Sequence, residues 1–402
     1  MTGIGIVGAG IAGLTVALRL RQLGVETTLY SVGDADAIRS GRLPGAVART
    51  GGMRAREREL GCEHYADPGC LVDAASFSIK GVPPLEFTGR IADPYSVVDF
   101  RLLLPALMED LAGKGGKIVV TGTEPDAAQV DRWSREHELM VVAAGRRSVA
   151  ELFPRDPGRS PYGEPQRRLF AGVFHGVRAG TTLSSAISPA CGEIFCMPML
   201  TRAGLASAIL VEAIPGGPLE PLTRMDPAGV GPALLAAIAE HAPSLRERID
   251  TAAFEPAGPE EAWCGAITPT VREAVATLPS GRVALAVGDA WIVNDPLTGQ
   301  GANVGSACAW IAAESIAAGG PYDVSFARAV AGRMWEEVAG PVTAWTNTFL
   351  QPPADHILDL LAAAATRTEA ADLVLELLSD PARHWSVLSS PDEVNRLVDA
   401  LV

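Results

Sequence analysis

The chain has 402 residues, carries a formal net charge of -14 at pH 7 and is 48% hydrophobic. This length predicts a globular protein of two closely packed domains, because one domain typically holds about 100–200 residues. The negative charge argues against a nucleic-acid partner, since binding to a phosphate backbone requires clustered Lys and Arg.

Targeting and metal-binding signals are missing from the sequence. The amino terminus has neither a basic region nor a cleavage site, and no run of about 18 apolar residues occurs, so we expect a cytoplasmic protein without a membrane contact. The cysteines form no C-x-x-C pair and have no histidine at ligand spacing. We therefore expect neither a bound metal nor a disulfide framework. These cysteines are Cys62, Cys70, Cys191, Cys196, Cys264 and Cys308.

The first elements in the chain predict a nucleotide site. Residues 4–8 (IGIVG) form a short apolar strand, residues 11–24 have helical spacing, and residues 25–31 form a second strand. The turn between strand and helix has G-x-G-x-x-G spacing, typical of an adenine dinucleotide site. In this motif the glycines permit the tight turn, the approach of the backbone to a pyrophosphate and close helix packing. The glycines concerned are Gly8, Gly10 and Gly13.

Two features near this motif need separate interpretation. Ser31 ends the second strand, where an acidic residue usually binds the ribose. A serine hydroxyl can still form that bond, and Asp34 is near enough to replace it. Arginines are dense between residues 39 and 58. They form either a solvated helix face or a surface in which one or two arginines meet a pyrophosphate.

A second glycine-rich turn lies far along the chain. Residues 283–287 (VALAV) form a buried strand that leads to Gly288 and Asp289, and a helix begins near Gly301. A carboxylate at a strand end could accept hydrogen bonds from sugar-like hydroxyls. Pro296 stiffens the turn, and its glycines leave the backbone N–H groups and the helix dipole open to a ring. FAD needs such a second contact because its ribityl chain and isoalloxazine extend beyond the ADP half. The turn contains Pro296, Gly299, Gly301, Ala302 and Asn303.

The segments between these turns predict a sheet above the flavin. Residues 167–177, 184–200 and 204–215 have strand patterns. The earlier strand at 139–145 ends at Gly145, without the D-G pair that single-component hydroxylases often carry. Widely dispersed histidines and the absence of a convincing triad leave no side chain as a catalytic group.

The chain resembles the oxygenase component of styrene monooxygenase and its indole monooxygenase relatives over nearly its whole length. The stretches that carry the resemblance are residues 97–118, 296–316, 344–349 and 384–394. The resemblance implies a flavin-dependent monooxygenase that takes reduced FAD from a separate NAD(P)H:flavin reductase. With O2 the flavin would form a C4a-hydroperoxide, which epoxidises or hydroxylates an indole C2–C3 bond or a styrene-like alkene.

The same resemblance implies roles for further residues. Arg42 and Arg101 match arginines near the FAD phosphates, Gly145 is included among the cofactor contacts, Asp289 matches the ribityl ligand, and the second turn matches the loop at the isoalloxazine. Residues 42–50 (RLPGAVART) match a segment that lines the substrate pocket. The expected pocket residues are Gly45, Val47, Arg49, Tyr95 and Pro296.

The expected fold is α/β: a Rossmann-like FAD-binding domain (1–150 and 276–320), an inserted substrate-binding β-sheet domain (151–275) and a C-terminal helical region (321–402). A biosynthetic indole oxygenase, whose product cyclises a tethered terpenoid chain, is one alternative function. A single-component NAD(P)H-dependent aromatic hydroxylase and a non-catalytic flavin-binding protein are others. Substrate identity, stereochemistry, the reductase and a homodimeric state stay open from sequence.

Overall fold

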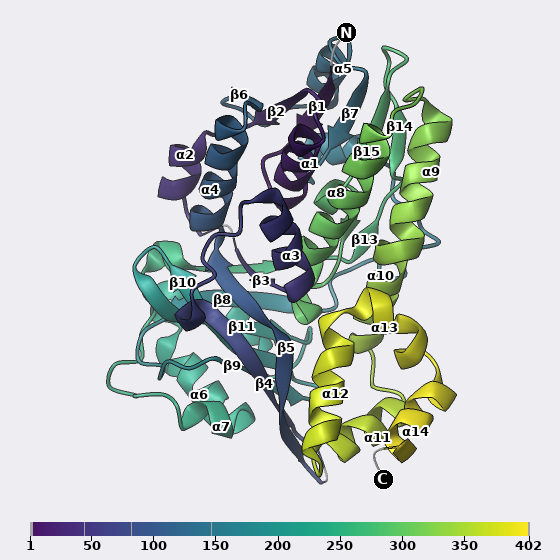
Figure 1. The fold of residues 1–402 in the computed structure, drawn as a ribbon. Helices are drawn as coiled ribbons and strands as arrows, with labels where there is room; N and C mark the ends of the chain where they lie inside the picture. The colour runs from purple at the N-terminus through teal and green to yellow at the C-terminus, as the bar shows by residue number, and fades with distance from the viewer. Residues whose placement is uncertain (1–2, 44, 82, 146, 401–402) are drawn as a thin grey trace.

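The computed structural model describes residues 3–43, 45–81, 83–145 and 147–400. Figure 1 shows a sheet covered by helices at the top, a broad sheet of mixed strand direction below it, and yellow C-terminal helices beside that lower sheet. No helix in the described residues is long and apolar enough to cross a membrane.

The upper sheet contains the first nucleotide motif. Its strand order is β14-β15-β7-β1-β2-β6, with parallel pairing from β15 to β6 and an antiparallel edge strand β14. Both faces of the central strands are covered, so these strands are apolar without alternation. The strands are β1 (Ile4–Val7), β2 (Thr27–Ser31), β6 (Lys117–Val120), β7 (Leu139–Val142), β14 (Val275–Thr277) and β15 (Val283–Ala286).

Helices pack on this sheet in the alternating order that a doubly wound fold requires. Helix α1 is buried along most of its length because it lies between the sheet and α8. The predicted helices at 11–24 and from Gly301 are confirmed as α1 and α8. The helices of this layer are α1 (Ile11–Gln22), α2 (Ala35–Ser40), α3 (Gly51–Leu60), α4 (Phe100–Gly113), α5 (Ala127–Ser134), α8 (Gly301–Ala317) and α9 (Val324–Met334).

The lower sheet has the order β12-β8-β11-β10-β9-β4-β5-β3. The predicted strand region 184–200 holds two strands, β9 and β10, because Ala190 (φ 64°) and Gly192 (φ 125°) turn the chain between them. The strands are β3 (Ala46–Arg49), β4 (Leu71–Ile79), β5 (Leu85–Asp99), β8 (Arg168–Phe174), β9 (Thr182–Ser188), β10 (Gly192–Thr201), β11 (Gly204–Ala213) and β12 (Ala262–Ala266). A separate short pair joins β13 (Thr270–Val271) to β16 (Ile292–Val293).

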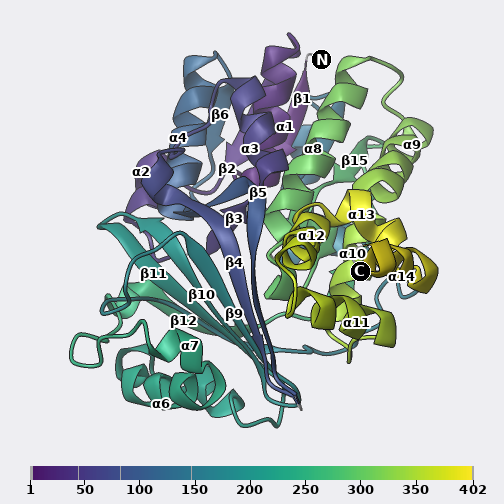
Figure 2. The same ribbon diagram turned by 60° about the horizontal axis from the view of Figure 1, so that its bottom comes forward.

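The two faces of the lower sheet have different coverings. Helices α6 (Gly231–His241) and α7 (Pro243–Arg246) cover one face, where Ile209 and Val211 of β11 join their apolar core. Figure 2 shows these helices on the side away from the upper sheet and its helices. Because strand side chains alternate, Leu210 and Glu212 point to the other face.

Sheet membership crosses the expected domain limits. Strands β3, β4 and β5 lie within residues 1–150, yet they belong to the lower sheet with β8–β12. The chain therefore passes from the upper sheet to the lower one and back before residue 150. Residues 1–150, which we expected to form part of the FAD-binding domain, contribute strands to both sheets.

The C-terminal region is helical and packs against β5 through α12. Its core joins Val72 and Val97 of the lower sheet to Trp345 and Val374. The predicted α/β fold with a Rossmann-like sheet, an inserted sheet and C-terminal helices is thus confirmed. The remaining helices are α10 (Gly340–Phe349), α11 (Asp355–Ala364), α12 (Thr368–Ser379), α13 (Pro381–Leu388) and α14 (Pro391–Ala400).

Candidate active site

The expected cofactor residues meet at one edge of the upper sheet. Strands β15, β7 and β1 are neighbours and parallel, so their carboxyl ends lie side by side. These ends lead directly to Asp289, Gly145 and Gly8. In open α/β sheets, ligands bind in the crevice outside such strand ends.

The first glycine turn has the geometry of a dinucleotide cradle. Gly8 has φ 105°, which disfavours a side chain, and a Cβ on Gly13 would lie 1.9 Å from the Gly8 carbonyl oxygen. A Cβ on Gly10 would meet no described atom within 4 Å beyond its chain neighbours. Gly13 is thus required for packing, whereas Gly10 faces open space, as expected where backbone approaches a pyrophosphate. The residues of this turn therefore fit a dinucleotide such as FAD.

Contacts between α1 and α8 bring the two glycine-rich turns together. A Cβ on Gly288 would lie 2.8 Å from the Cβ of Ala12, and one on Gly305 would lie 3.5 Å from it. A Cβ on Gly145 would likewise lie 2.4 Å from the Cβ of Asp289. Small residues at these positions allow the close approach. Turns almost 300 residues apart in the chain therefore form parts of one site.

The second turn, residues 295–303, ends at an uncapped helix. Gly299 has φ 64°, and α8 begins at Gly301 without a side-chain cap. A Cβ on either glycine would meet nothing within 4 Å among the described atoms. Helix α1 also begins without a side-chain cap, at Gly10. Two helix amino termini therefore present N–H groups that can satisfy an anion or an electron-rich ring.

Asn303 joins this turn to the expected substrate segment. Its Nδ2 donates to the carbonyl oxygens of Ala48 (2.9 Å) and Gly299 (3.1 Å). Its Oδ1 accepts from the backbone N–H and the hydroxyl of Thr50. Asn303 is buried, while the neighbouring Ala302 is half-buried. Residues 46–50 are therefore fixed against the turn that we expect at the isoalloxazine.

Ser31 and Asp34 lie near the first turn but have local partners. The Ser31 hydroxyl donates to the Gly33 carbonyl oxygen at 2.6 Å. Its oxygen keeps the capacity to accept a hydrogen bond from a ribose hydroxyl. Asp34 instead accepts from the Ala37 N–H as the N-cap of α2. Ser31 thus retains the chemistry expected of it, and its ribose contact stays a prediction.

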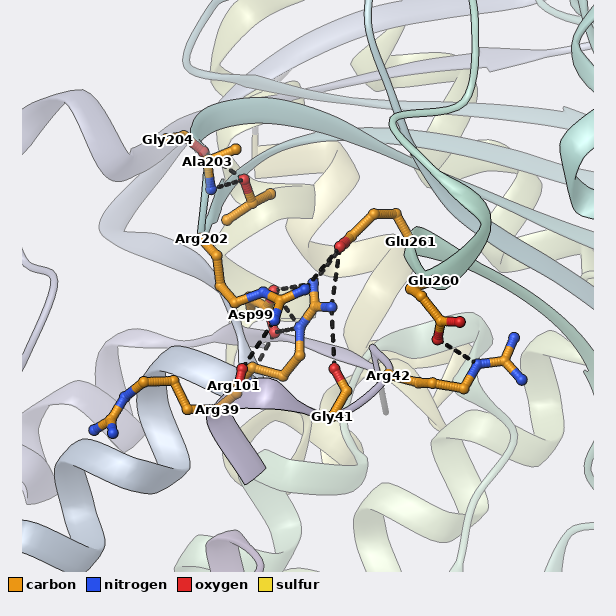
Figure 3. A network of polar contacts seen from close by, with 11 residues as sticks. Arg39, Gly41, Arg42, Asp99, Arg101, Arg202, Ala203, Gly204, Glu260 and Glu261 are labelled. Atoms are coloured by element: carbon orange, nitrogen blue, oxygen red, sulfur yellow. Dashed lines mark hydrogen bonds and ion pairs between the residues drawn. The ribbon is translucent and has the colours of Figure 1, made fainter. Parts of the chain in front are cut away.

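The two arginines expected at the FAD phosphates have acidic partners (Figure 3). Arg42 is exposed and its Nε lies 2.9 Å from an oxygen of Glu260. Arg101 is fully buried and donates to both carboxylate oxygens of Asp99, at 2.6–3.0 Å, and to Glu261. Burial lowers the pKa of Arg101, but the hydrogen bonds to Asp99 and Glu261 outweigh this effect and raise it. Arg101 therefore joins α4 to the turn before β12, and its contact with phosphate stays a prediction.

The expected pocket residues do not share one environment. Gly45 has φ 147°, and a Cβ there would approach Phe100 no closer than 3.7 Å. Val47 is buried in the core of the upper layer. Tyr95 donates from its hydroxyl to Ser379 Oγ at 2.8 Å, which joins β5 to α12. Pro44, in the same segment, lies outside the described residues.

Arg49 has a structural environment. It is fully buried and its Nη1 lies 2.6 Å from Glu57 Oε2. Its Nη2 donates to the carbonyl oxygen of His64 and to the hydroxyl of Ser96, each at 2.8 Å. These partners engage both terminal nitrogens of the guanidinium, whereas its Nε is buried and has no hydrogen-bond partner among the described residues. The arginine-rich segment is thus neither wholly a solvated face nor wholly a phosphate surface.

The sequence did not predict a cluster of four charged side chains between the lower sheet and the second turn. Glu193 of β10, Glu212 of β11, Asp295 and Arg167 are all buried there, and we call them the acid cluster. Glutamates inside the apolar stretches GEIFC and ILVEA were the available signal, because charged residues are almost never fully buried unless paired.

Known proteins resemble this chain over most of its length. Residues 145–248 match the family described as "Styrene monooxygenase A putative substrate binding domain". The chain is 32% identical to styrene monooxygenase StyA of a Pseudomonas species, over 98% of this chain and 96% of that protein.

Solved structures show the same fold at low sequence identity. A triple mutant of the flavin-dependent brominase Bmp2 aligns with a TM-score of 0.67 at 17% identity, over 100% of this chain and 99% of that one. A flavoprotein/dehydrogenase from Cytophaga hutchinsonii aligns with a TM-score of 0.68 at 12% identity, over 99% and 98% of the two chains.

Proposed function

Because the chain belongs to the styrene monooxygenase family and is an FAD-dependent monooxygenase, we propose that it is the oxygenase component of a two-component system. A separate NAD(P)H:flavin reductase supplies reduced FAD, and the substrate is an alkene conjugated to an aromatic ring. The observation that carries this proposal is the joining of both glycine-rich turns through α1 and α8 into one extended site. Such a site suits the whole length of FAD rather than a nicotinamide dinucleotide.

The chain contributes binding, orientation and exclusion of water. FAD supplies the oxygen-activating chemistry when it is bound. The amino terminus of α1 would hold the pyrophosphate, and that of α8 would stabilise negative charge on the ring. Phe195, Met197 and Leu210 lie on the sheet face that Glu212 shares, and Glu212 interacts with Asp295 beside the second turn. These apolar side chains support a water-poor surface for the substrate next to that turn.

The proposed substrates also include indole and larger, substituted indoles. Gly45 places no side chain in its segment, and a Cβ there would contact only Phe100, at 3.7 Å, among the described atoms within 4 Å. This space favours substrates larger than styrene, including an indole that carries a tethered chain. O2 is the co-substrate, and a cytoplasmic location and a homodimer remain predictions.

Purified protein with FAD, NADH and O2 should convert no substrate until an unrelated flavin reductase is added. Styrene, indole and a prenylated indole should then give oxygenated products by mass spectrometry, while ethylbenzene, which lacks the alkene, should give none. Fast reduction of bound flavin by NADH alone would instead support a single-component hydroxylase. Tight FAD binding with no product from any of the alkenes would support a non-catalytic flavin-binding protein.

A further inference from the structure

The acid cluster holds two glutamates directly opposite each other. Glu193 on β10 and Glu212 on β11 are cross-strand partners in the antiparallel register, so their side chains share one face. Like charges in such a pair destabilise a sheet. Both residues are buried, at 6% and 0% exposure, so water cannot screen the repulsion. At least one of the two glutamates needs compensation.

Arg167 compensates Glu193. Its Nε lies 2.8 Å from Glu193 Oε2 and its Nη2 lies 3.0 Å from Oε1, a bidentate arrangement. Its Nη1 donates to the carbonyl oxygen of Gln166. The one arginine of the cluster is thus engaged by Glu193, and the carboxyl of Glu212 must be stabilised in another way.

Glu212 meets the carboxyl of Asp295. Both oxygens of Glu212 and Oδ2 of Asp295 are buried, and no N–H group or alcohol hydroxyl in the described part of the chain donates to them. The two carboxyl groups are close enough for each to shift the pKa of the other as a side-chain hydrogen-bonding partner. Two carboxyl groups at that range form a hydrogen bond only when one of them carries a proton.

A proton on Glu212 agrees with the surrounding charges. Burial raises the pKa of Glu212 well above its ordinary value, and Asp295 and Glu193 raise it further, while Arg167 opposes the rise. Burial also raises the pKa of Asp295, but the bond with Glu212 and the charge of Arg167 oppose that rise. The described residues contain no group of three or more His, Cys, Asp and Glu side chains that could hold a metal ion.

Asp295 connects this pair to the second turn. Its Oδ1 accepts from the Leu297 N–H at 3.2 Å, and Asp295 is the N-cap of the 3₁₀ turn Pro296–Thr298. The turn continues through Gly299 to the amino terminus of α8. The bond between Glu212 and Asp295 therefore links strand β11 to the backbone that we expect beside the isoalloxazine.

We propose that Glu212 and Asp295 share one proton, and that this proton holds residues 295–299 against β11 in the position that binds FAD. The proposal rests on the proposed function only in placing FAD at this turn. Glu212 is then a positioning residue. Loss of its proton would place two negative charges beside each other, release the turn and repel an anionic reduced flavin.

Thermal unfolding without flavin tests the shared proton. The folded state keeps a proton that an unfolded glutamate loses above a pKa of about 4.3, so the stabilisation is complete below that pH and is lost as pH rises through the raised pKa. Glu212→Gln keeps a neutral hydrogen-bond donor at this position. We expect the melting temperatures of Glu212→Gln and Asp295→Asn to change less with pH than that of the wild type between pH 5 and 9. Glu255→Gln, at an exposed carboxylate, should follow wild type. Curves of equal slope for wild type and Glu212→Gln would overturn the proposal.

FAD titration over the same pH range tests the coupling to the flavin. Wild-type Kd for FAD should rise by up to about tenfold for each pH unit above the pKa of the pair, because only the protonated form binds well. Glu212→Gln should show a nearly constant Kd. Equal pH dependence in the two proteins would overturn the coupling while leaving the proposed function intact. No FAD binding at any pH would contradict the proposed function. The unfolding curves would still show whether Glu212 and Asp295 share a proton.

Discussion

Gly10→Val should lower the affinity for FAD at least about a hundredfold, equivalent to about 2.7 kcal/mol, with little change in melting temperature. Gly10 has φ -83° and ψ -177°, which any residue can adopt, and a Cβ there meets no described atom within 4 Å. The folded chain therefore tolerates valine. A pyrophosphate that approaches this backbone does not, because the side chain occupies the same space. Isothermal titration with FAD and a thermal melt measure the two effects.

Two further glycine variants make this test specific. Gly13→Ala should lower both stability and FAD affinity, because its Cβ would lie 1.9 Å from the Gly8 carbonyl oxygen and 3.3 Å from the Cβ of Ala143. Gly332→Val, at an uncrowded position in α9, should leave FAD affinity unchanged. Unaltered FAD affinity in Gly10→Val would mean that the pyrophosphate lies elsewhere.

Arg49→Met should destabilise the protein by about 3–5 kcal/mol, since removing one partner of a buried ion pair leaves the other uncompensated. Glu57 would remain with a side-chain exposure of 7%. Burial already raises the pKa of Glu57 against the opposing charge of Arg49, so the variant should raise that pKa further. Because a raised carboxyl pKa gives stability that is lost as pH rises, the defect should be smallest at acid pH. Urea unfolding at pH 5 and pH 8 measures it.

Controls separate this structural role from a substrate contact. Arg58→Met, at an exposed arginine that pairs with Glu63, should cost less than about 1 kcal/mol. Arg49→Met combined with Glu57→Gln should recover part of the loss because the buried charge is removed. A stable Arg49→Met protein with altered substrate preference would instead support the pocket role expected from the sequence.

The upper layer was predictable because its signals are local. The turn at Gly8–Gly13 lies within one strand and one helix, and the turn before Gly301 precedes a helix directly, so spacing alone predicts both. The contact between the two turns was harder to predict, since it depends on Ala12 of α1 meeting Gly288, which follows β15, and Gly305 of α8. Resemblance to a known family supplied that step.

Residues whose role depends on distant partners could not be placed from sequence. The environment of Arg49 is set by Glu57 and Ser96, and that of Tyr95 by Ser379, which lies 284 residues away. The lower sheet takes β3–β5 from within the expected nucleotide domain, because strand pairing follows tertiary contacts rather than chain order. The role of Glu212 could not be predicted for the same reason, because it depends on Asp295, which is distant in the sequence and adjacent only in the fold.

The most direct test mixes the purified protein with photoreduced FAD under argon, adds O2 and styrene without NADH or a reductase, and quantifies styrene oxide per FAD. The account predicts nearly one oxide for each reduced FAD, with Gly10→Val giving close to none. Flavin reoxidation at the rate of free FAD, with no oxide from wild-type protein, would contradict it.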